Sequence, residues 1–357
     1  MSAARYSIAP KELRHICEQA RGDCLRLRKA RIFLTGCTGF LGKWIVEALL
    51  WAGEELGLDL RLFALTRSVA ALREAMPHWA GHAALRLLEG DVLSWRPPAA
   101  LGVTHMIHGA NYCQTGQEDW ALRHMETAVY GTRRMLDLAA AEGCKSVLLL
   151  SSGAVYGLRR QGGDPPYREQ ENGPQDYLRE PNVYAVCKYF AEMQAAALGL
   201  QHGMRIPIAR LFTFAGQHMP LHRRQALSSF LLDARQGKDI AVAGDGTAVR
   251  SYMHAADMVI CLLALLLRGK HGTPYNVGSA EAVSIRTLAH KVAAASGGNM
   301  AVTVLGQPAP GNAPETYVPD VSALRALMGK PTGRDIDAIL QDEELAGSTP
   351  GYVKETP

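Results

Sequence analysis

The chain has 357 residues, 48% of them apolar and 20% charged, and a formal net charge of +4. These values are typical of a soluble globular protein, and no basic stretch is concentrated enough to predict nucleic-acid binding. Seven scattered cysteines favour reduced thiols over a disulfide framework, and no Cys or His spacing predicts a metal site. The N-terminus has no apolar signal segment, and the longest apolar run, 258–267, is about half a membrane span. We therefore expect a cytoplasmic protein that does not bind membranes.

The first 30 residues predict an external helix without a chemical role. From residue 31, predicted strands (31–35, 60–66, 84–89, 103–109, 146–151, 205–213) alternate with predicted helices (42–53, 68–76, 116–142, 182–200, 222–236, 255–268, 284–296). This alternation is typical of an α/β fold with a Rossmann-type, doubly wound parallel sheet. We assign the dinucleotide-binding domain to 31–213 and 256–271, and a smaller substrate-binding lobe to 214–255 and 272–330. Residues 157–183 predict a long loop walling the site, and 331–357 a polar tail.

Three glycines follow the first predicted strand at a spacing of three: Gly36, Gly39 and Gly42. The first lets the chain turn, the second lets backbone N–H groups approach a phosphate, and the third lets a helix pack close to the strand. The spacing differs from the generic Gly-x-Gly-x-x-Gly pattern, so the strand-turn-helix context carries the interpretation. The turn predicts a dinucleotide site in which a pyrophosphate meets unpaired N–H groups at a helix N-terminus.

The second predicted strand ends in Thr66, Arg67 and Ser68, without the carboxylate that usually binds the adenosine ribose of NAD. A carboxylate would repel a 2′-phosphate, whereas a guanidinium pairs with it. We therefore expect NADP(H) in preference to NAD; the alternative for Arg67 is a solvated side chain at a strand end. Asp91, after the third strand, is a candidate ligand of the adenine amino group or else a turn cap.

Ser152 ends the fifth predicted strand, and Tyr184 and Lys188 lie one turn apart on the next helix. The ammonium lowers the pKa of the phenol toward neutrality, which makes Tyr184 a usable general acid or base. The Ser152 hydroxyl can hold the same substrate oxygen. A lone Tyr-x-x-x-Lys pair is more often an ordinary helix surface. Its position after the glycine turn and the Ser-rich strand end favours catalysis.

These features together resemble the extended short-chain dehydrogenases/reductases of the NAD(P)-dependent nucleotide-sugar epimerase/dehydratase family, in particular the UDP-glucose 4-epimerase-like members. The matching motifs run in family order over residues 31–325: 35–42, 108–110, 131–132, 151–157, 184–188, 210–212, 244–246, 250–254 and 276–278. The resemblance implies that Ser152, Tyr184 and Lys188 form the catalytic triad, with Lys188 also holding the nicotinamide ribose. It implies cofactor contacts at Gly36, Thr38, Gly39, Phe40, Leu41, Gly42, Thr66, Arg67, Ser68, Asp91, Val92, Ala110, Tyr184 and Lys188.

The same resemblance implies a nucleotide-diphosphate sugar as substrate. Arg250 would bind the diphosphate, with a surface ion pair as its alternative role, and Asn276 would line the nucleotide pocket. Thr213 stands where relatives carry an asparagine that contacts the diphosphate, and Ala128 replaces a common structural asparagine. The stretch 309–320 lacks the additional arginine of many relatives. The substrate pocket is therefore expected to have diverged, and the sequence does not name the sugar.

Other departures narrow the reaction. Ser152, Gly153 and Ala154 stand where 4,6-dehydratases carry Thr-Asp-Glu, and neither Gly153 nor Ala154 can titrate, so we do not expect a dehydratase. Ala154 also replaces the cysteine of fucose-synthase-type 3,5-epimerases, which leaves His218 as a pocket-wall or turn residue. What remains is hydride transfer at C4 of the sugar. An NADPH-dependent 4-ketoreductase of an NDP-4-keto-(6-deoxy)hexose is favoured by the Thr66-Arg67 pair over a 4-epimerase that retains its cofactor.

Two further hypotheses concern the role and assembly of the chain. A non-catalytic dinucleotide-binding protein on the same fold is the distant alternative, disfavoured because Ser152, Tyr184 and Lys188 are all present. The resemblance also implies a homodimer in which the helices at 116–142 and 182–200 pack against those of the partner as a four-helix bundle.

Overall fold

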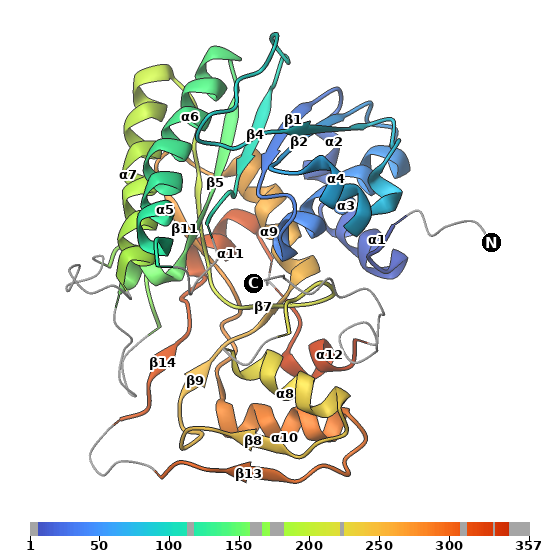
Figure 1. The fold of residues 1–357 in the computed structure, drawn as a ribbon, viewed down its shortest axis with the longest axis vertical. Helices are drawn as coiled ribbons and strands as arrows, with labels where there is room; N and C mark the ends of the chain where they lie inside the picture. Colours follow the sequence, from blue (N-terminus) through green and yellow to red (C-terminus); the bar gives the residue numbers. More distant parts are fainter. Residues whose placement is uncertain are drawn as a thin grey trace.

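The computed structural model describes residues 6–112, 118–157, 166–171, 182–221, 225–307, 313–330 and 333–342. Its centre is a seven-stranded parallel sheet with the order β11-β6-β5-β4-β1-β2-β3 (Figure 1). The strands are β1 (Arg31–Thr35), β2 (Arg61–Thr66), β3 (Leu85–Glu89), β4 (His105–His108), β5 (Ser146–Ser152), β6 (Ile208–Leu211) and β11 (Pro274–Val277). Because the chain winds outward in both directions from β1, the predicted Rossmann-type fold is confirmed.

Helices cover both faces of this sheet. One face carries α1 (Pro10–Gln19), α2 (Arg21–Leu25), α3 (Phe40–Glu55), α4 (Val69–Ala75), the 3-10 turn η1 (Pro77–Trp79), α9 (Ala255–Arg268) and α11 (Ser322–Met328). The other face carries α6 (Thr132–Ala141) and α7 (Val183–His202). A π-helical turn, η2 (Thr127–Gly131), joins α5 (Trp120–Glu126) to α6, so the helix predicted at 116–142 is interrupted in its middle, and 116–117 lie outside the described residues.

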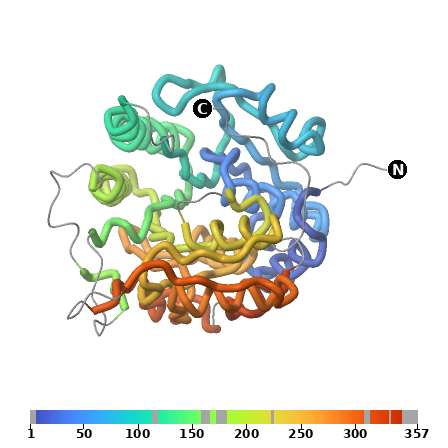
Figure 2. The backbone as a smooth tube through the Cα atoms, turned by 60° about the horizontal axis from the view of Figure 1, so that its bottom comes forward, coloured from blue at the N-terminus to red at the C-terminus, as the bar shows by residue number. Residues whose placement is uncertain are grey.

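A smaller lobe lies below the sheet in Figure 1, and Figure 2 shows its yellow-to-red segments gathered together. It contains the parallel pair β8 (Ile240–Val242) and β13 (Val302–Val304), and three short paired strands, β9 (Val249–Arg250), β12 (Val283–Ser284) and β14 (Thr316–Tyr317). Helices α8 (Ala226–Arg235), α10 (Ile285–Ala295) and α12 (Ile336–Leu340) build its core. The pair β7 (Phe214–Ala215) and β10 (Met253–His254) lies between the lobe and the sheet in Figure 1.

The structure differs from the sequence expectation at the edge of the sheet. β11 pairs with β6, so residues 274–277 belong to the main sheet, although the sequence assigns 272–330 to the smaller lobe. The strand predicted at 205–213 is shorter, because only β6 (Ile208–Leu211) belongs to the sheet; the chain then leaves it, and β7 pairs with β10 instead. Of the loop predicted at 157–183, residues 158–165 and 172–181 lie outside the described residues. Within the described ranges, no helix is both long enough and apolar enough to cross a bilayer.

Helix α9 explains why the N-terminal segment belongs to the fold. Every residue of α9 except Arg268 is buried. A helix that is apolar all round must be covered on every side. The sheet and α3 cover part of it, and α1 lies across it through Leu13 and Ile16, which are at most 1% exposed. The segment predicted as an external helix without a role is therefore the outer cover of α9.

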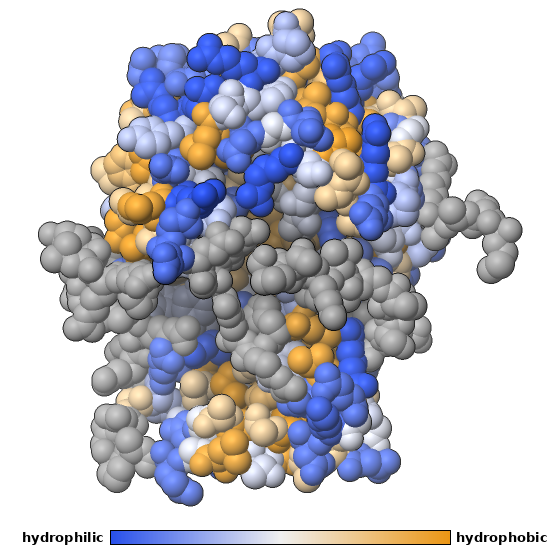
Figure 3. Space-filling view, viewed as in Figure 1, coloured by the Kyte–Doolittle hydropathy of each residue, from blue (hydrophilic) through white to orange (hydrophobic). Residues whose placement is uncertain are grey.

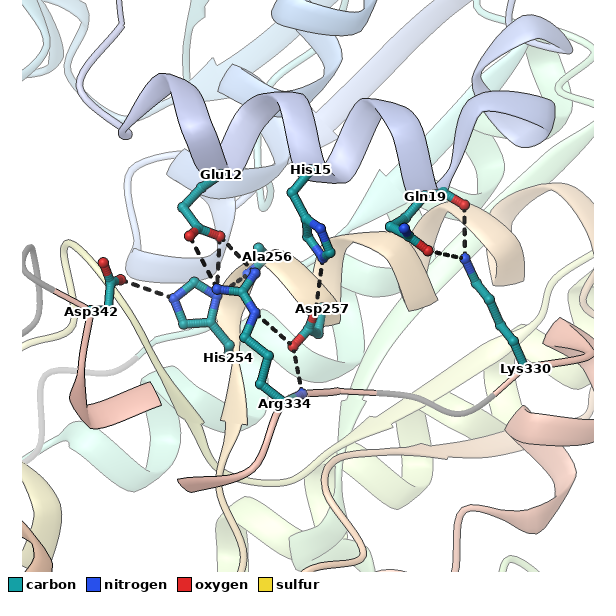
Figure 4. A network of polar contacts seen from close by, with 9 residues as sticks. All are labelled: Glu12, His15, Gln19, His254, Ala256, Asp257, Lys330, Arg334 and Asp342. Carbon is teal, nitrogen blue, oxygen red and sulfur yellow. Dashed lines mark hydrogen bonds and ion pairs between the residues drawn. The ribbon is translucent and has the colours of Figure 1, made fainter. Parts of the chain in front are cut away.

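Polar contacts hold α1 in this place (Figure 4). Glu12 accepts two hydrogen bonds from Arg334, at 3.0 and 2.7 Å, and His254, at the N-cap of α9, lies 3.1 Å from the Asp342 carboxylate. Glu12, His254 and Asp342 are close enough together for a metal ion. However, Arg334 pairs with Glu12, and Lys11 lies 3.3 Å from Asp342, so cationic side chains already offset these carboxylates.

A second buried carboxylate fixes the start of the described chain. Glu47 of α3 accepts hydrogen bonds from the backbone N–H groups of Ser7 and Ile8, from His78 at 2.6 Å and from the Trp79 indole at 3.1 Å. Burial alone would raise the pKa of Glu47, but the hydrogen bonds from His78, Ile8 and Ser7 outweigh it and lower the pKa below its ordinary value. The ionised carboxylate therefore stabilises the folded chain.

We predict that Glu47→Gln lowers the free energy of unfolding at pH 7 by about 2–4 kcal/mol, because it leaves buried donors without a charged acceptor. The lowered pKa means that this contribution is present above the unfolded pKa of the carboxyl and is lost as pH falls through the folded pKa. The difference between wild type and variant should therefore shrink in acid. Denaturant unfolding at several pH values measures it. Glu55→Gln, an exposed change on the same helix, is the control, and equal losses from both variants would contradict the assignment.

Candidate active site

The glycine turn after β1 is shaped by two close backbone approaches. Gly36 has a φ of 79°, and a Cβ there would lie 2.6 Å from the carbonyl oxygen of Gly109. A Cβ at Gly42 would lie 2.2 Å from the carbonyl oxygen of Gly36. Gly39 is the N-cap of α3 and supplies no side-chain cap. The first N–H groups of α3 therefore open toward the mouth of the turn, where Thr38 and Gly39 are exposed.

A buried histidine ties the glycine turn to β4. The Thr35 hydroxyl oxygen accepts hydrogen bonds from the N–H groups of Gly109 and Ala110, at 3.2 and 3.1 Å. Its own hydrogen then points to Nδ1 of His108, 2.8 Å away, while Nε2 lies 3.1 Å from the Thr132 hydroxyl. Burial, and next the charge of Lys188, lower the pKa of His108 to about 3. This imidazole is neutral and positions the ends of both strands.

A cavity of about 100 Å³ opens beside the turn at the carboxyl ends of β1, β2, β3 and β4. Parallel sheets bind ligands at this edge. The structure brings together seven residues that the sequence predicts as cofactor contacts, and they line the cavity: Gly36, Thr38, Thr66, Arg67, Asp91, Val92 and Ala110. Arg67 is exposed, and Asp91 both lines the cavity and accepts a hydrogen bond from the N–H of Leu93, so the turn cap expected as its alternative is also formed.

The remaining predicted contacts lie around this cavity without lining it. Ser68 is the N-cap of α4, and its hydroxyl accepts a hydrogen bond from the N–H of Ala71. Phe40 and Leu41 are half-buried in the first turn of α3. Sequence reasoning missed Asn111, Tyr112 and Thr127, which do line the cavity. Asn111 and Tyr112 follow the carboxyl end of β4 closely, so the strand-end rule could have found them.

The three predicted catalytic residues come from β5 and α7, which pack against each other. Ser152 ends β5, and its hydroxyl oxygen accepts a hydrogen bond from the N–H of Ala154 in the following 3-10 turn η3 (Gly153–Tyr156). The Lys188 ammonium donates a hydrogen bond of 2.9 Å to the carbonyl oxygen of Leu150. Tyr184 lies one helical turn before Lys188 on α7, at the same end of the sheet.

Contacts connect Tyr184 to the wall of the cofactor cavity. Its ring packs against the imidazole of His124 on α5, with centroids 5.2 Å apart. Nδ1 of His124 lies 3.0 Å from the carbonyl oxygen of Tyr112, which lines the cavity. The Tyr184 ring is therefore linked to the cavity wall through His124, and its predicted catalytic role stays a prediction.

Behind this site, a buried ion pair joins α7 to the sheet. Arg210 of β6 and Glu192 of α7 lie 2.7 Å apart, and both side chains are at most 7% exposed. The Ser151 hydroxyl of β5 donates to the same carboxylate. Because one carboxylate accepts from two neighbouring strands, it sets the position of α7 relative to the end of β5.

The residues predicted for the substrate lie on β9, on β11 and between β6 and β7. Arg250 of β9 donates to the carbonyl oxygens of Val249 and Glu315 and lies 3.0 Å from the Glu315 carboxylate, so the ion pair expected as its alternative is formed. Thr213 is half-buried between β6 and β7, and its carbonyl oxygen accepts a hydrogen bond from the N–H of Met253.

Asn276 is fully buried, and the protein itself uses its side-chain amide. Its Oδ1 accepts a hydrogen bond of 2.6 Å from the Tyr156 hydroxyl, and its Nδ2 donates to the carbonyl oxygens of Tyr167 and Asp320. Both amide hydrogens are therefore occupied. This amide joins β11 to the segments around it, and its predicted contact with a nucleotide stays a prediction.

His218, expected as a pocket-wall or turn residue, lies in the turn after β7 with a φ of 67°. Its Nε2 lies 2.8 Å from the Ser7 hydroxyl, and burial, followed by the charge of Lys43, lowers its pKa to about 4.

A second cavity, of about 280 Å³, lies in the smaller lobe between α8, β8 and the start of α10. Its lining includes Phe230, Val242, Gly246 and Ala248. Ala248 lies two residues before Arg250 in the chain, and Arg250 itself does not line this cavity.

The model of the NAD dependent epimerase/dehydratase family matches residues 32–278, which is more than half of the chain. The chain belongs to this family. Membership confirms the predicted family resemblance, and dinucleotide binding at the glycine turn stays a prediction.

Curated members of the family are similar to the chain over most of its length. A UDP-glucuronic acid decarboxylase 1 of Xenopus tropicalis is 27% identical over 305 residues, which cover 84% of this chain and 68% of the relative. A UDP-glucuronic acid decarboxylase 3 of Arabidopsis thaliana is 27% identical over 308 residues, covering 84% and 83%.

Solved structures in the family share the fold. A UDP-N-acetylglucosamine 4-epimerase of Methanobrevibacter ruminantium M1, in complex with UDP-N-acetylmuramic acid, has a TM-score of 0.73 at 19% identity, covering 89% of this chain and 98% of its own. A dTDP-glucose 4,6-dehydratase of Bacillus anthracis in complex with NAD has a TM-score of 0.70 at 16% identity, covering 89% and 96%. At sequence identities this low, the similarity shows a shared fold and nothing more.

Proposed function

We propose that the chain is an NADPH-dependent 4-ketoreductase that acts by hydride transfer at C4 of a nucleotide-linked 4-keto sugar. The observation that carries the proposal is the Lys188 ammonium, held by the carbonyl oxygen of Leu150 one helical turn from Tyr184. This arrangement holds a charged donor one helical turn from a phenol, and His124 contacts both the ring of that phenol and the Tyr112 carbonyl of the cavity wall. A bound nicotinamide supplies the hydride.

The chain supplies the proton and the orientation. In the reductive direction, Tyr184 gives its proton to the oxygen at C4 as the hydride arrives at the carbon, and the Lys188 ammonium stabilises the phenolate that remains. Ser152 holds the same oxygen from the end of β5. His108, neutral and fully buried beside Lys188, adds no competing charge.

The nucleotide part of the substrate is proposed to extend across the smaller lobe. We assign Arg250 to the diphosphate, and the cavity of about 280 Å³ lined in part by Ala248 is roomy enough for a nucleoside. A bound diphosphate would replace the Glu315 carboxylate as the partner of the Arg250 guanidinium.

Two observations favour simple reduction over elimination of water. The positions after Ser152 are Gly153 and Ala154, which cannot move protons. A Cβ at Gly153 would lie 2.4 Å from the Tyr317 hydroxyl and 2.9 Å from the Phe212 ring, so this position has no room for a carboxylate side chain. Arg67, at the cofactor cavity, favours NADPH over NADH.

A second candidate is an enzyme that retains its cofactor, because the curated relatives are named UDP-glucuronic acid decarboxylases and the solved neighbour is named a 4-epimerase. Oxidation at C4 serves both reactions. A C4 ketone can accept the hydride on its other face, and it lies β to a C6 carboxylate, an arrangement that loses carbon dioxide readily. In either case the hydride returns to the sugar and the cofactor ends unchanged.

We predict that the purified protein binds NADPH reversibly and oxidises it with a nucleotide-linked 4-keto sugar. Tyr184→Phe should lower kcat by a factor of about 10²–10⁴ because the proton donor is lost, while NADPH binding is retained. Steady-state kinetics and fluorescence titration with NADPH measure the two effects. Tyr189→Phe, a change at an exposed tyrosine on the same helix, should leave turnover unchanged. Purification with a tightly held, non-exchanging NAD or NADP would support the second candidate instead.

Arg67→Ala is predicted to weaken NADPH binding by about 10–100-fold and to leave NADH binding within a factor of two. The lost charge-assisted hydrogen bonds to the 2′-phosphate account for the difference. Fluorescence titration with both nucleotides measures it. Arg61→Ala, at the other end of the same strand and also exposed, is the matched control. Equal losses for NADPH and NADH in the Arg67 variant would contradict the NADP preference.

We also propose a homodimer through α5, η2 and α7. Large exposed apolar side chains gather on these elements, which pack against each other: Leu122, Met125, Tyr130, Tyr189, Phe190, Met193 and Leu200. Figure 3 shows apolar side chains at its left edge, the side on which Figure 1 draws α5 and α7. A face of this kind on two adjacent helices suits a second copy of the same face.

Met193→Glu is predicted to convert the dimer to a monomer, because a charge at a position 56% exposed in the isolated chain would be buried in the interface. Sedimentation velocity at micromolar concentration measures the change. Leu305→Glu, at a similarly exposed leucine of the smaller lobe, should leave the dimer intact. A wild-type monomer at that concentration would refute the proposal.

A further inference from the structure

Tyr317 connects the smaller lobe to the end of β5. The residue ends β14, and its side chain is half-buried. Its hydroxyl lies so close to the backbone of Gly153 that a Cβ added to this glycine would meet the hydroxyl oxygen at 2.4 Å. Gly153 follows Ser152, the residue proposed to hold the reacting oxygen. A phenol from a distant part of the chain therefore occupies the space that a side chain at position 153 would fill.

Neighbouring rings fix the place of this phenol. The Phe212 ring packs against the Tyr317 ring with centroids 4.7 Å apart, and the Tyr167 ring meets it edge-on at 5.9 Å. The same Phe212 ring would lie 2.9 Å from a Cβ at Gly153. Because these aromatic contacts limit the motion of the Tyr317 ring, its hydroxyl is held beside the backbone of Gly153.

The pairing of β14 with β9 puts Tyr317 next to Arg250. The two strands run parallel, and Tyr317 is the partner of Arg250 in their register. The strands are held together by the N–H of Val249, which donates to the Glu315 carbonyl oxygen, and by the Arg250 guanidinium, which lies 3.0 Å from the Glu315 carboxylate. Tyr317 therefore has the arginine proposed for the diphosphate as its strand neighbour and the end of β5 beside its hydroxyl.

The proposed substrate reaches from Arg250 to Ser152. Its diphosphate is attached to C1 of the sugar, and hydride transfer takes place at C4, whose oxygen is assigned to Ser152. Tyr317 adjoins both ends of this path, because it pairs with Arg250 and its hydroxyl lies beside the residue after Ser152. A phenolic hydroxyl donates one hydrogen bond and accepts others, so it can pair with a sugar hydroxyl and still keep a contact with the protein.

We propose that Tyr317 is a specificity-determining residue whose hydroxyl forms a hydrogen bond with a hydroxyl group of the hexose bound between Arg250 and Ser152. The inference rests on the proposed function, because that function supplies the nucleotide-linked sugar. It also explains Gly153, because the absence of a side chain leaves the space that the phenol occupies. In a glucose unit at this place, the hydroxyls that remain for Tyr317 are those at C2 and C3 on one edge of the ring and at C6 on the other.

Tyr317→Phe removes the hydroxyl and keeps the ring. Calorimetric titration without added dinucleotide compares glucose linked to UDP, dTDP, GDP or CDP with the same nucleoside diphosphate alone. We expect the variant to bind the preferred nucleotide-linked glucose about 3–10-fold more weakly than wild type, as for one lost hydrogen bond, and to bind the nucleoside diphosphate within a factor of about two. Tyr167→Phe, a change at a buried ring of the same aromatic cluster, should bind both ligands as wild type does.

Xylose in place of glucose separates the two edges of the sugar, because xylose lacks C6 and keeps the hydroxyls at C2 and C3. A loss of affinity in Tyr317→Phe that occurs with glucose and disappears with xylose would support a contact at C6. A loss of the same size with both sugars would support a contact at C2 or C3. Steady-state kinetics provides a second readout: KM for the sugar should rise about 3–10-fold, while kcat should change less than about threefold.

Gly153→Ala tests the position of the hydroxyl from the other side. The added methyl group would meet the Tyr317 hydroxyl and the Phe212 ring, so we expect weaker binding of the nucleotide-linked glucose. Once Tyr317→Phe has removed the hydroxyl, the same methyl group should cost less affinity. The double variant should therefore bind more tightly than the product of the two separate losses predicts, and losses that simply multiply would contradict the placement of the hydroxyl at position 153.

Three further results overturn the inference. Equal losses in Tyr317→Phe for the nucleotide-linked glucose and the nucleoside diphosphate would mean that Tyr317 only supports Arg250. Unchanged affinities in the folded variant, checked by thermal unfolding, would mean that the hydroxyl does not contact the sugar. Failure of all four nucleotide-linked glucoses to bind wild type would leave no hexose for Tyr317 to contact. Because binding is measured without turnover, the expected loss of affinity in a protein that never oxidises NADPH would refute the reductase and retain the role of Tyr317.

Discussion

The hydrogen bond from the Lys188 ammonium to the Leu150 carbonyl is the contact on which the proposed chemistry depends. It joins the ammonium of the proposed catalytic group to a backbone atom of a central strand, whose position is fixed by neighbours on both sides. The Glu192 carboxylate, shared by Arg210 and Ser151, holds α7 against the same strand ends. These two sets of contacts fix the part of α7 that carries the Tyr184 phenol. Under the proposed function, loop residues near the site could change without moving the proposed reacting group.

Much of the fold and of the cofactor site could be predicted from the sequence because the signals are local. The glycine turn, the strand ends and the Tyr-x-x-x-Lys spacing each lie within a few residues, and parallel topology brings their ends to one edge. Arg67 and Asp91 line the cavity for this reason. β11 was not foreseen as a strand of the main sheet, because four residues carry too little pattern to show which sheet they join.

The parts that sequence could not supply depend on partners far along the chain. Asn276 is held by Tyr156, Tyr167 and Asp320, three segments whose meeting no spacing predicts. The pairing of Arg250 with Glu315 likewise joins residues 65 apart in the chain. His124 looks like an ordinary polar residue on an amphipathic helix until its burial against Tyr184 is seen.

The helix that lies across α9 has a practical consequence. The family model matches residues 32–278. The side chains that shield α9 from water come from α1, however, and the carboxylates and the guanidinium that hold α1 in place come from residues 12, 334 and 342. A protein truncated to the residues of that match would lack α1 and would leave the apolar surface of α9 exposed to solvent. We expect such a fragment to aggregate. We therefore expect the smallest fragment that folds on its own to extend beyond residues 32–278, so its termini should include α1 and the residues that hold α1 in place.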